Sequence, residues 1–453
     1  MALIIVVPNS GRSTAWELTL CIAIAAGLKM STIIAVGVPR LFQFVVWLFA
    51  YVFFGLAATS QIRSGVIAST TPGIPARYDL PTAVMVVIGL VCFELGCIVD
   101  RRRFVAPQVS KVRSLAISRG RTIALGVFGF VFSAYFVEKI GPGAFISSRE
   151  VLGATLAARW PDGSTAAVMA SLGYVPLLVS SQALLHGSRG RRLSGAVGSA
   201  RRWRLVGVLS MIPLLFIMNP IGNARYTSGT VYASLVGAFG GFATRLRSTV
   251  SMIAIVLSLL FVFPIADAFR FSHSGGLSRP GFFAEYIGNG DYDAFWTLAN
   301  SLIYVESEGY VWGRQLLGVV FFWVPRSVWA AKPTDTGILL AQYRGYGFTN
   351  LSAPLWAELY LSFGIPAVII GFFLLGRLFN RLDVAGATAF VGGGFPSIAA
   401  SVLPFYTIIL LRGSLLQATG GLTVLLACNQ FIATGRARRD LLGNRGAVGS
   451  GSG

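Results

Sequence analysis

Few side chains in this sequence could act as a general base outside the cytoplasm. Glu358 lies just inside an apolar segment, and an ionisable group at membrane depth indicates a functional site. Asp267 and His273 lie in the long stretch 267–353, and histidine can accept a proton near neutral pH. We therefore rank Glu358 first and Asp267 second as candidates for deprotonating a hydroxyl group. His273, Glu285, Glu306 and Glu308 are further candidates. The structural alternative for Glu358 is an ion pair with a nearby arginine.

Basic residues around the same stretch could bind a phosphate group. Arginine presents a planar fork that pairs bidentately with phosphate, and clustered cations at a membrane surface are costly without anions. The alternative for each residue is an ion pair with a nearby carboxylate or a lipid headgroup. The candidate phosphate-binding residues are Arg225, Arg270, Arg314, Arg326 and Lys332, with Arg279 and Arg344 on the same face.

Asp291-Tyr292-Asp293 has the D-x-D pattern by which some glycosyltransferases hold a metal and a nucleotide-sugar. Nucleotide-sugars are cytoplasmic, whereas these residues are expected outside. The two aspartates also precede an amphipathic stretch, so we interpret them as caps of a helix and predict no metal site. The apolar face of that helix comprises Phe295, Leu298, Leu302 and Val305.

Composition determines the class of protein. Of 453 residues, 55% are hydrophobic and only 12% are charged, and the mean hydropathy is +0.71. Apolar runs near the length that crosses a bilayer recur along the chain, and a spanning run must be a helix to satisfy its own backbone. We predict an all-α polytopic membrane protein with about eleven transmembrane helices, at 14–37, 41–59, 81–99, 122–138, 166–186, 203–219, 228–243, 249–266, 354–376, 395–411 and 414–433.

Basic residues predict the orientation. The loops 100–121 and 187–204, the turn near residue 245 and the tail are rich in arginine, and counted alternately they all fall on one side. The positive-inside rule makes that side the cytoplasm, which places the N-terminus outside and the C-terminus in the cytoplasm of a multi-pass protein of the cytoplasmic membrane. The net charge of +20 then reports orientation. We expect no nucleic-acid partner, because the basic residues are divided among short loops.

Four parts follow from this topology. Residues 1–266 form N-terminal transmembrane helices, 267–353 an external loop that carries the chemistry, 354–435 C-terminal transmembrane helices, and 436–453 a flexible cytoplasmic tail. The loop contains the amphipathic helix and then an apolar run, 316–324, that is too short to span. We predict that this run is a re-entrant or interfacial helix, which requires a covering of protein or a water-filled cavity.

Several motifs are similar to those of the Wzy-type polymerases of O-antigen and exopolysaccharide repeat units. The most specific block is Pro325-Arg326-x-x-Trp329-x-x-Lys332-Pro333, preceded by Gly313-Arg314 and Phe322-Trp323. The others are Asn219-Pro220 with Asn223-Ala224-Arg225-Tyr226, Phe263-Pro264-x-x-Asp267-x-Phe269-Arg270, Asp291-Tyr292-Asp293, Ala357-Glu358-Leu359-Tyr360 and Pro39-Arg40-Leu41-Phe42. The similarity covers much of residues 39–376.

The resemblance implies a GT-C-like glycosyltransferase that joins repeat units carried on undecaprenyl pyrophosphate, without a nucleotide-sugar or other cofactor. Its partners would be lipid-linked oligosaccharides, membrane lipids, a flippase and a chain-length regulator. The residues themselves suggest a mechanism that fits this family. Arg225, Arg270, Arg314, Arg326 and Lys332 would bind the pyrophosphate, and Glu358, Asp267 or His273 would be the base of an inverting, metal-independent reaction. Substrate-binding residues would be Asp291, Asp293, Arg279, Arg344, Tyr226, Trp329 and Tyr360.

Two other functions fit the same sequence features. An O-antigen ligase shares the lipid-linked donor but transfers the finished chain to a different acceptor. A transporter or flippase of lipid-linked oligosaccharides predicts ionisable residues along a path across the membrane. Among the acidic residues of the apolar segments, Glu17, Glu94 and Glu358 could serve this path, but the polar groups cluster on one side.

Overall fold

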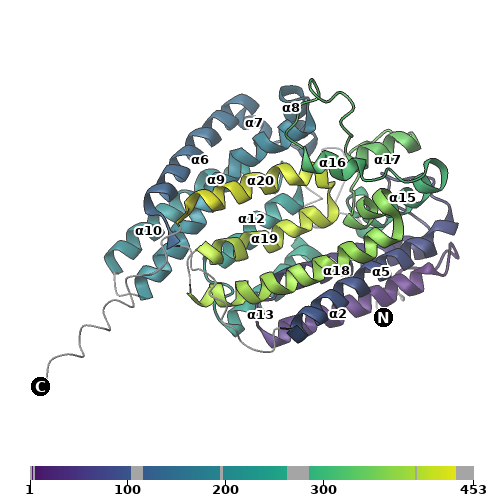
Figure 1. The fold of residues 1–453 in the computed structure, drawn as a ribbon, viewed down its shortest axis with the longest axis horizontal. Helices are drawn as coiled ribbons and strands as arrows, with labels where there is room; N and C mark the ends of the chain where they lie inside the picture. The colour runs from purple at the N-terminus through teal and green to yellow at the C-terminus, as the bar shows by residue number, and fades with distance from the viewer. Residues whose placement is uncertain are drawn as a thin grey trace, which may run out of the picture.

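The computed structural model of the chain is helical (Figure 1). It describes residues 3, 6–103, 116–193, 197–262, 285–392 and 395–434. The strands among these residues are β1 Ala116–Ile117 and β2 Ala433–Thr434, which pair antiparallel. The predicted all-α class is therefore confirmed.

Helices occupy every predicted membrane segment. They are α2 Ala15–Val36, α3 Leu41–Phe49 with η1 Ala50–Ala57 and α4 Ala58–Ser64, α5 Asp79–Arg103, α6 Arg119–Ile140, α9 Gly163–Leu193, α10 Val197–Leu209 with α11 Met211–Ile217, α12 Arg225–Ala238, α13 Arg245–Leu257 with η3 Ser258–Val262, α18 Leu355–Gly392, α19 Phe395–Arg412 and α20 Leu415–Ile432. Of the described helices, eight are long and apolar enough to cross a membrane. The chain is a multi-pass membrane protein, and eleven crossings remain a prediction.

The other three predicted segments are shorter for local reasons. The helix over 197–217 is interrupted at Ser210, because Pro213 lacks an N–H and its ring clashes with the carbonyl of Leu209. α12 has 14 residues and stops before Gly240, whose φ of 86° is a left-handed conformation that glycine favours. The apolar part of α19 covers only Ile398–Arg412.

Two hydrophobic cores organise the bundle. The first is built mainly by α2, α3 with η1 and α4, α5 and α18. The second is built mainly by α6, α9, α12 and α20, and the two groups occupy different halves of the ribbon in Figure 1. α19 joins them, since Phe405 and Leu411 belong to the first core and Ile398 and Val402 to the second.

α5 and α18 make an unusually close contact within the first core. A Cβ atom added at Gly96 would lie 2.1 Å from the carbonyl oxygen of Phe373, and one at Gly376 would lie 2.0 Å from that of Phe93. Small residues at such a crossing let two backbones approach closely in a membrane. The two glycines therefore fix how α18 lies along α5.

Contacts between distant segments gather at two ends of the molecule. One end, here called the loop end, carries residues 285–353 together with neighbours such as Asp162 and Gly73, which meet Arg326 and Arg344. The other, here called the basic end, carries the pair of Arg381 with Asp100 and the β1–β2 pairing. These contacts agree with the alternation of ends that the arginine pattern predicts.

Short helices form most of the described loop: η5 Gly290–Tyr292, α15 Ala294–Glu308, α16 Arg314–Val320 and α17 Thr336–Arg344. The amphipathic prediction for α15 is wrong for most of the helix. Phe295, Leu298 and Leu302 are buried as expected, but every residue from Ala294 to Ile303 is buried. Burial on all sides is tolerated because polar side chains there find internal partners: the indole N–H of Trp296 donates to Gln61 Oε1 at 2.7 Å.

The predicted helix caps are also wrong. Asp293 occupies the N-cap position of α15, but its backbone is helical, at φ −82° and ψ −3°, and its side chain accepts no hydrogen bond from the first turn. A capping side chain needs an extended backbone to reach the N–H groups that follow it. Asp293 instead accepts hydrogen bonds from the hydroxyl (2.5 Å) and N–H (3.2 Å) of Ser352.

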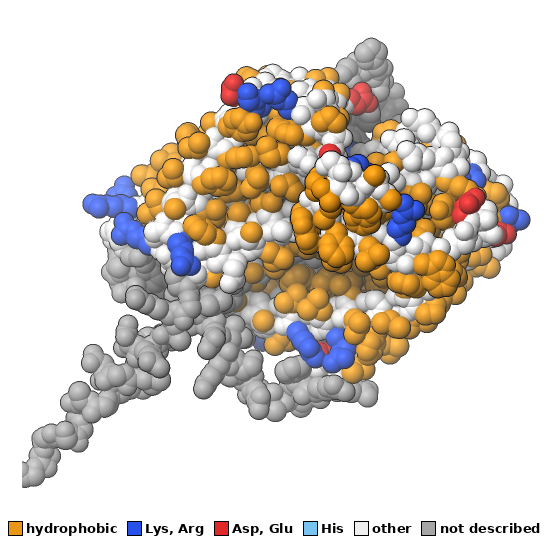
Figure 2. Space-filling model, turned by 45° about the horizontal axis from the view of Figure 1, so that its top comes forward, with side chains coloured by type: hydrophobic (Ala, Val, Ile, Leu, Met, Phe, Trp, Pro, Cys, Tyr) orange, Lys and Arg blue, Asp and Glu red, His pale blue; other side chains and the backbone are white. Residues whose placement is uncertain are grey.

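α16 exposes large apolar side chains. Leu317 and Val320 on the helix, and Phe321 and Trp323 just after it, are between 42% and 64% exposed. Hydrophobic side chains cover most of the surface in Figure 2, and lysine and arginine side chains gather towards its margins. The exposed apolar surface of α16 fits the predicted interfacial element, and its position relative to the membrane remains a prediction.

Candidate active site

Three arginines from different helices converge on one carboxylate at the loop end. Asp291 lies 3.2 Å from Arg225 at the start of α12, and 3.4 Å from Arg149 at the start of α8 Arg149–Arg159. Arg412, the last residue of α19, approaches the same carboxylate at 4.0 Å and donates to the backbone carbonyl of Asp291 at 2.9 Å. We call Arg149, Arg225 and Arg412 the arginine cluster.

Two further carboxylates balance this cluster. Glu285 lies 3.7 Å from Arg225, and Asp293 lies 3.7 Å from Arg412. Among the described residues, three guanidinium groups thus face three carboxylates. The side chain of Arg225 is only 4% exposed, which makes this a buried ion-pair network. Removing one partner from such a network leaves an uncompensated buried charge.

Aromatic rings enclose the inner side of the cluster. The guanidinium of Arg412 lies 4.4 Å from the ring centroid of Tyr226 and 5.9 Å from that of Phe53. The hydroxyl of Tyr226 donates to the carbonyl oxygen of Asp291 at 3.4 Å. Cation–π contacts of this kind stabilise a partly desolvated arginine and fix the plane of its fork.

Asp293 is the most deeply buried carboxylate of the network. Burial raises its pKa above the ordinary aspartate value, while the charge of Arg412 and the hydrogen bonds from Ser352 oppose that shift. Because Ser352 stands just before α18, Asp293 connects the start of α15 to the start of that helix.

Glu358 lies in a second cluster and has no arginine partner. The hydroxyl of Thr336 donates to Oε2 at 2.8 Å, and the N–H of Leu415 donates to Oε1 at 3.0 Å. Leu415 is the first residue of α20, so Glu358 caps that helix. No described arginine or lysine lies within ion-pair distance of Glu358, and the alternative of an arginine pair is not found.

Asp335 is a second buried carboxylate beside Glu358. Its Oδ1 accepts the N–H of Gly337 at 2.8 Å, and this bond caps α17. Burial raises the pKa of Asp335 to about 6. Its charge acts on Glu358, so the two carboxylates form an interacting pair.

The turn between α19 and α20 connects the two clusters. Arg412 belongs to the arginine cluster, and its carbonyl oxygen accepts the N–H of Ala353 at 2.8 Å. Three residues later, the N–H of Leu415 is bound to Glu358. A single short turn thus connects Arg412 of the arginine cluster to the backbone N–H that binds Glu358.

Three of the residues predicted to bind phosphate donate hydrogen bonds to backbone carbonyl groups in this structure. Arg314 donates to the carbonyl of Ala331 at 3.0 Å, and Arg326 donates to those of Lys332 (2.8 Å) and Pro333 (3.2 Å). Lys332 donates to the carbonyls of Phe322 and Val324 and to the hydroxyl of Ser164; the three distances are 2.6, 3.0 and 3.2 Å. These side chains fold the segment after α16 back on itself.

The remaining predicted residues are dispersed. Arg344 donates to the carbonyl of Gly73 at 2.8 Å, Trp329 is half-buried in the segment after α16, and Tyr360 lies against Tyr310 with ring centroids 6.1 Å apart. Asp291, Asp293, Arg225 and Tyr226 are brought together by the arginine cluster. The other predicted site residues, Asp267, Arg270, His273 and Arg279, lie outside the described residues.

Sequence reasoning missed Arg412, Arg149 and Asp335. Arg412 stands at the end of an apolar segment on the side predicted to be external, where the positive-inside rule makes arginine uncommon. That departure was a usable signal. The pairing of Arg149 with Asp291 spans 142 residues of sequence and had no local signal.

Comparison with known proteins gives no further assignment. The chain matches no family model, no curated protein and no solved structure. Within the described residues, no group of three or more histidine, cysteine, aspartate or glutamate side chains is placed to hold a metal ion. The function is therefore argued from the geometry of the two clusters.

Proposed function

We propose that the chain is a GT-C-like membrane glycosyltransferase that polymerises oligosaccharide repeat units carried on undecaprenyl pyrophosphate. In this proposal the loop end faces outward from the cytoplasmic membrane and the basic end faces the cytoplasm. The observation that carries the proposal is the convergence of three arginines on the carboxylate of Asp291. The motif resemblance in the sequence supports it independently.

The arginine cluster is suited to a pyrophosphate. The carboxylate of Asp291 occupies the position of an anion among three guanidinium groups, and phosphate competes well for that position because it accepts bidentate hydrogen bonds. Asp291 and Arg149 have side chains that are 19% and 38% exposed, so the cluster opens on their side. Positive charge held there would stabilise the leaving pyrophosphate without a metal.

Glu358 is the first-ranked candidate for the base, and it lies among the described residues. It would accept the proton of the acceptor hydroxyl while the donor sugar leaves the pyrophosphate at the arginine cluster, with inversion at the anomeric carbon. The partners of Glu358 are a hydroxyl and a backbone N–H, which leave it free of a fixed countercharge. Asp335, with its pKa raised to about 6, would receive or share that proton.

The decisive experiment is polymerisation in vitro. The protein is purified in lipid, given undecaprenyl-pyrophosphate repeat units from the same cell with EDTA present, and the products are separated on a gel. A ladder of lengths supports a metal-independent polymerase. Folded protein that yields no ladder from repeat units that a known ligase accepts would contradict the proposal.

One variant, tested in cells, separates polymerase from ligase. Loss of a polymerase leaves single repeat units attached to their acceptor, whereas loss of a ligase removes all attached chains. We expect Arg412→Gln to leave single units. Complete loss of attached chains would favour the ligase, and transport of labelled lipid-linked units across liposomes with no transfer would favour the flippase.

A further inference from the structure

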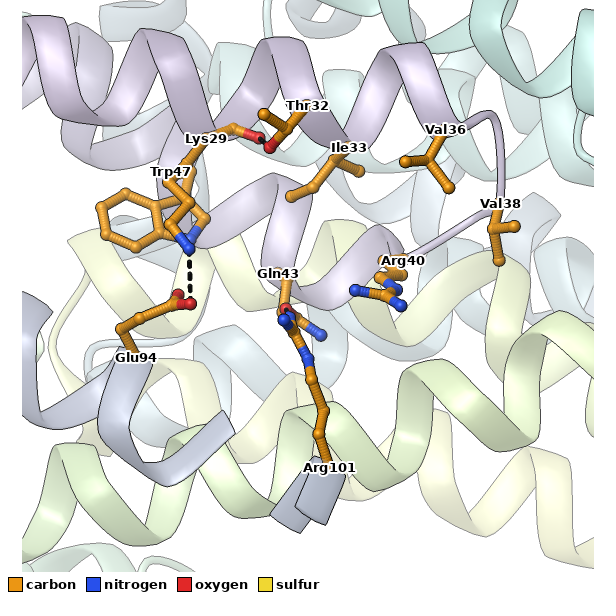
Figure 3. A pocket seen from close by; sticks show the side chains of 10 residues that line it. All are labelled: Lys29, Thr32, Ile33, Val36, Val38, Arg40, Gln43, Trp47, Glu94 and Arg101. Carbon is orange, nitrogen blue, oxygen red and sulfur yellow. Dashed lines mark hydrogen bonds and ion pairs between the residues drawn. The ribbon is translucent and has the colours of Figure 1, made fainter. Parts of the chain in front are cut away.

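A pocket at the basic end lies between α2, α3 and α5, far from both clusters described above. It has a volume of about 150 Å³, roughly the space of five water molecules in the liquid. Figure 3 shows the side chains of Lys29, Arg40 and Arg101 around it, with Gln43 and Thr32. Glu94 is the single carboxylate in the lining.

Two of the three cations already have partners. Lys29 pairs with Glu94 at 2.5 Å, and Arg101 donates to the side-chain oxygens of Gln43 (2.5 Å) and Asn380 (3.4 Å). Counting the lining residues alone, three cations and one carboxylate leave a formal charge of +2. Buried Asp383 lies just behind the lining and accepts three hydrogen bonds from Phe42 and Gln43; counting it as ionised still leaves +1.

Arg40 is the cation without a partner. Among the described residues its guanidinium has no hydrogen bond and no ion pair, although the residue is half-buried and directed into the pocket in Figure 3. Burial and then the charge of Arg101 lower the pKa of Arg40, while Asp383 acts in the opposite direction. The guanidinium is thus held near another cation with its hydrogen-bonding capacity unused, which favours an anion in the pocket.

The surroundings of the pocket are apolar and outward-facing. Only 33% of the spanning window of α2 is buried, and Ile24, Leu28 and Val36 are 53% to 63% exposed. In a membrane this face of α2 contacts lipid tails. Lys29 lies seven positions before the end of α2, about 10 Å along its axis, so the pocket extends inward from the end of the helix by about this distance.

We propose that this pocket binds the phosphate headgroup of an anionic phospholipid, whose acyl chains lie along the exposed face of α2. The phosphodiester would accept hydrogen bonds from Arg40 and from Lys29, and the headgroup would lie near Thr32 and Gln43. Basic pockets between transmembrane helices at the cytoplasmic side are suited to anionic headgroups. The lipid, rather than free phosphate, is favoured because the opening adjoins the apolar face of α2.

The test is a binding measurement on the full-length protein in a neutral detergent. Phosphatidylglycerol, phosphatidylcholine and inorganic phosphate are titrated separately, and binding is read from the midpoint of thermal unfolding and from lipid retained in native mass spectrometry. We expect phosphatidylglycerol alone to stabilise the protein. Equal stabilisation by phosphatidylcholine would contradict a charge-selective site, and saturation by inorganic phosphate with no further effect of lipid would contradict the lipid source.

Matched variants locate the site. Arg40→Gln should weaken phosphatidylglycerol binding about fivefold, the effect expected from one cation near an anionic lipid. Arg204→Gln makes the same change of charge on an exposed residue near the same end and should bind as the wild type does. Thr32→Phe keeps every charge and fills the opening from the exposed face of α2, so it should weaken binding even if Arg40→Gln does not fold. Unchanged binding in folded Arg40→Gln or Thr32→Phe protein would overturn the proposal.

Discussion

Arg412 contacts both the carbonyl oxygen and the carboxylate of Asp291, at 2.9 and 4.0 Å, across 121 residues of sequence. This contact joins the end of α19 to the loop of residues 285–353. It also places a half-buried cation at the turn between two apolar helices.

Replacing Arg412 with lysine should lower the polymerisation rate about 10²- to 10³-fold, the range seen when a group that stabilises developing charge is removed. Lysine keeps the charge but lacks the planar fork and the stacking on Tyr226. Initial rates of ladder formation measure the effect. Arg204→Lys is the matched control, and wild-type rates from folded Arg412→Lys protein would exclude Arg412 from the reaction.

Neutralising Asp291 should raise the affinity of the arginine cluster for an anion and lower the stability of the protein without ligand. Asp291→Asn removes one negative charge from the network, so that among the described residues three arginines face two carboxylates. We expect a lower unfolding midpoint without ligand and a larger rise on adding pyrophosphate than in the wild type. Thermal unfolding with and without pyrophosphate measures both. A smaller rise in the variant would mean that Asp291 is not in the place of the anion.

Glu358→Gln separates the charge of this residue from its role as a cap. The glutamine oxygen can still accept the N–H of Leu415, so the start of α20 should stay in place. A general base contributes about 10²- to 10⁴-fold, and we expect a loss of that size in the polymerisation rate with little change in the unfolding midpoint. Retained activity would leave Glu358 with a structural role alone.

Asp335 should make stability depend on pH. Its pKa is raised from 3.8 to about 6 in the folded chain, so between these values the folded state binds more protons than the unfolded state. Stability due to this group is therefore greatest below pH 4 and falls as the pH rises to about 6, by up to about 3 kcal/mol.

Asp335→Asn should lack this fall. Unfolding midpoints of the variant and the wild type, compared at pH 4.5 and pH 7, isolate the contribution of Asp335 from those of other carboxylates. The difference between the two proteins should change in favour of the variant as the pH rises. A constant difference would show that the carboxylate titrates normally.

Gly376→Ala should destabilise the chain, because its Cβ would lie 2.0 Å from the carbonyl oxygen of Phe93. Overpacking of this kind costs about 1–3 kcal/mol or more. Gly153→Ala is the matched control: it makes the same change within α8, where nothing lies within 4 Å of the added carbon. The two variants are compared by unfolding midpoint and gel filtration, and equal stability would mean that the α5–α18 contact can open without cost.

The positions of the helices could be predicted from the sequence, because they depend on the hydrophobicity of each local segment. Every apolar run became a helix, because a run without charges must satisfy its backbone internally in lipid. Prediction from the sequence was wrong where the role of a residue depends on a partner that is distant in the chain. In the sequence, Asp293 has the position of a helix cap, but in the structure it accepts hydrogen bonds from Ser352, 59 residues away. The sequence pattern of α15 is typical of a surface helix, but in the structure the first core encloses most of this helix.

The candidate site was predicted in part. Arg225, Tyr226, Asp291 and Asp293 were named as ligands and do lie together, whereas Arg314, Arg326 and Lys332 bind backbone carbonyls in this structure. A count of arginines on one face cannot distinguish an arginine that pairs with a carboxylate from one that binds backbone carbonyls, since both kinds lie near the same loop. The carbonyl acceptors depend on the fold of residues 321–333.

α19 supplies side chains to both hydrophobic cores, and Arg412 is its last residue. Any rotation of one half of the molecule against the other must therefore tilt or shift this helix. Arg412 of the arginine cluster lies at the end of α19, so a small change in the angle between the two halves would alter the spacing of the guanidinium groups in the cluster. If the cluster binds an anion as proposed, its affinity would depend on the angle between the two halves of the bundle.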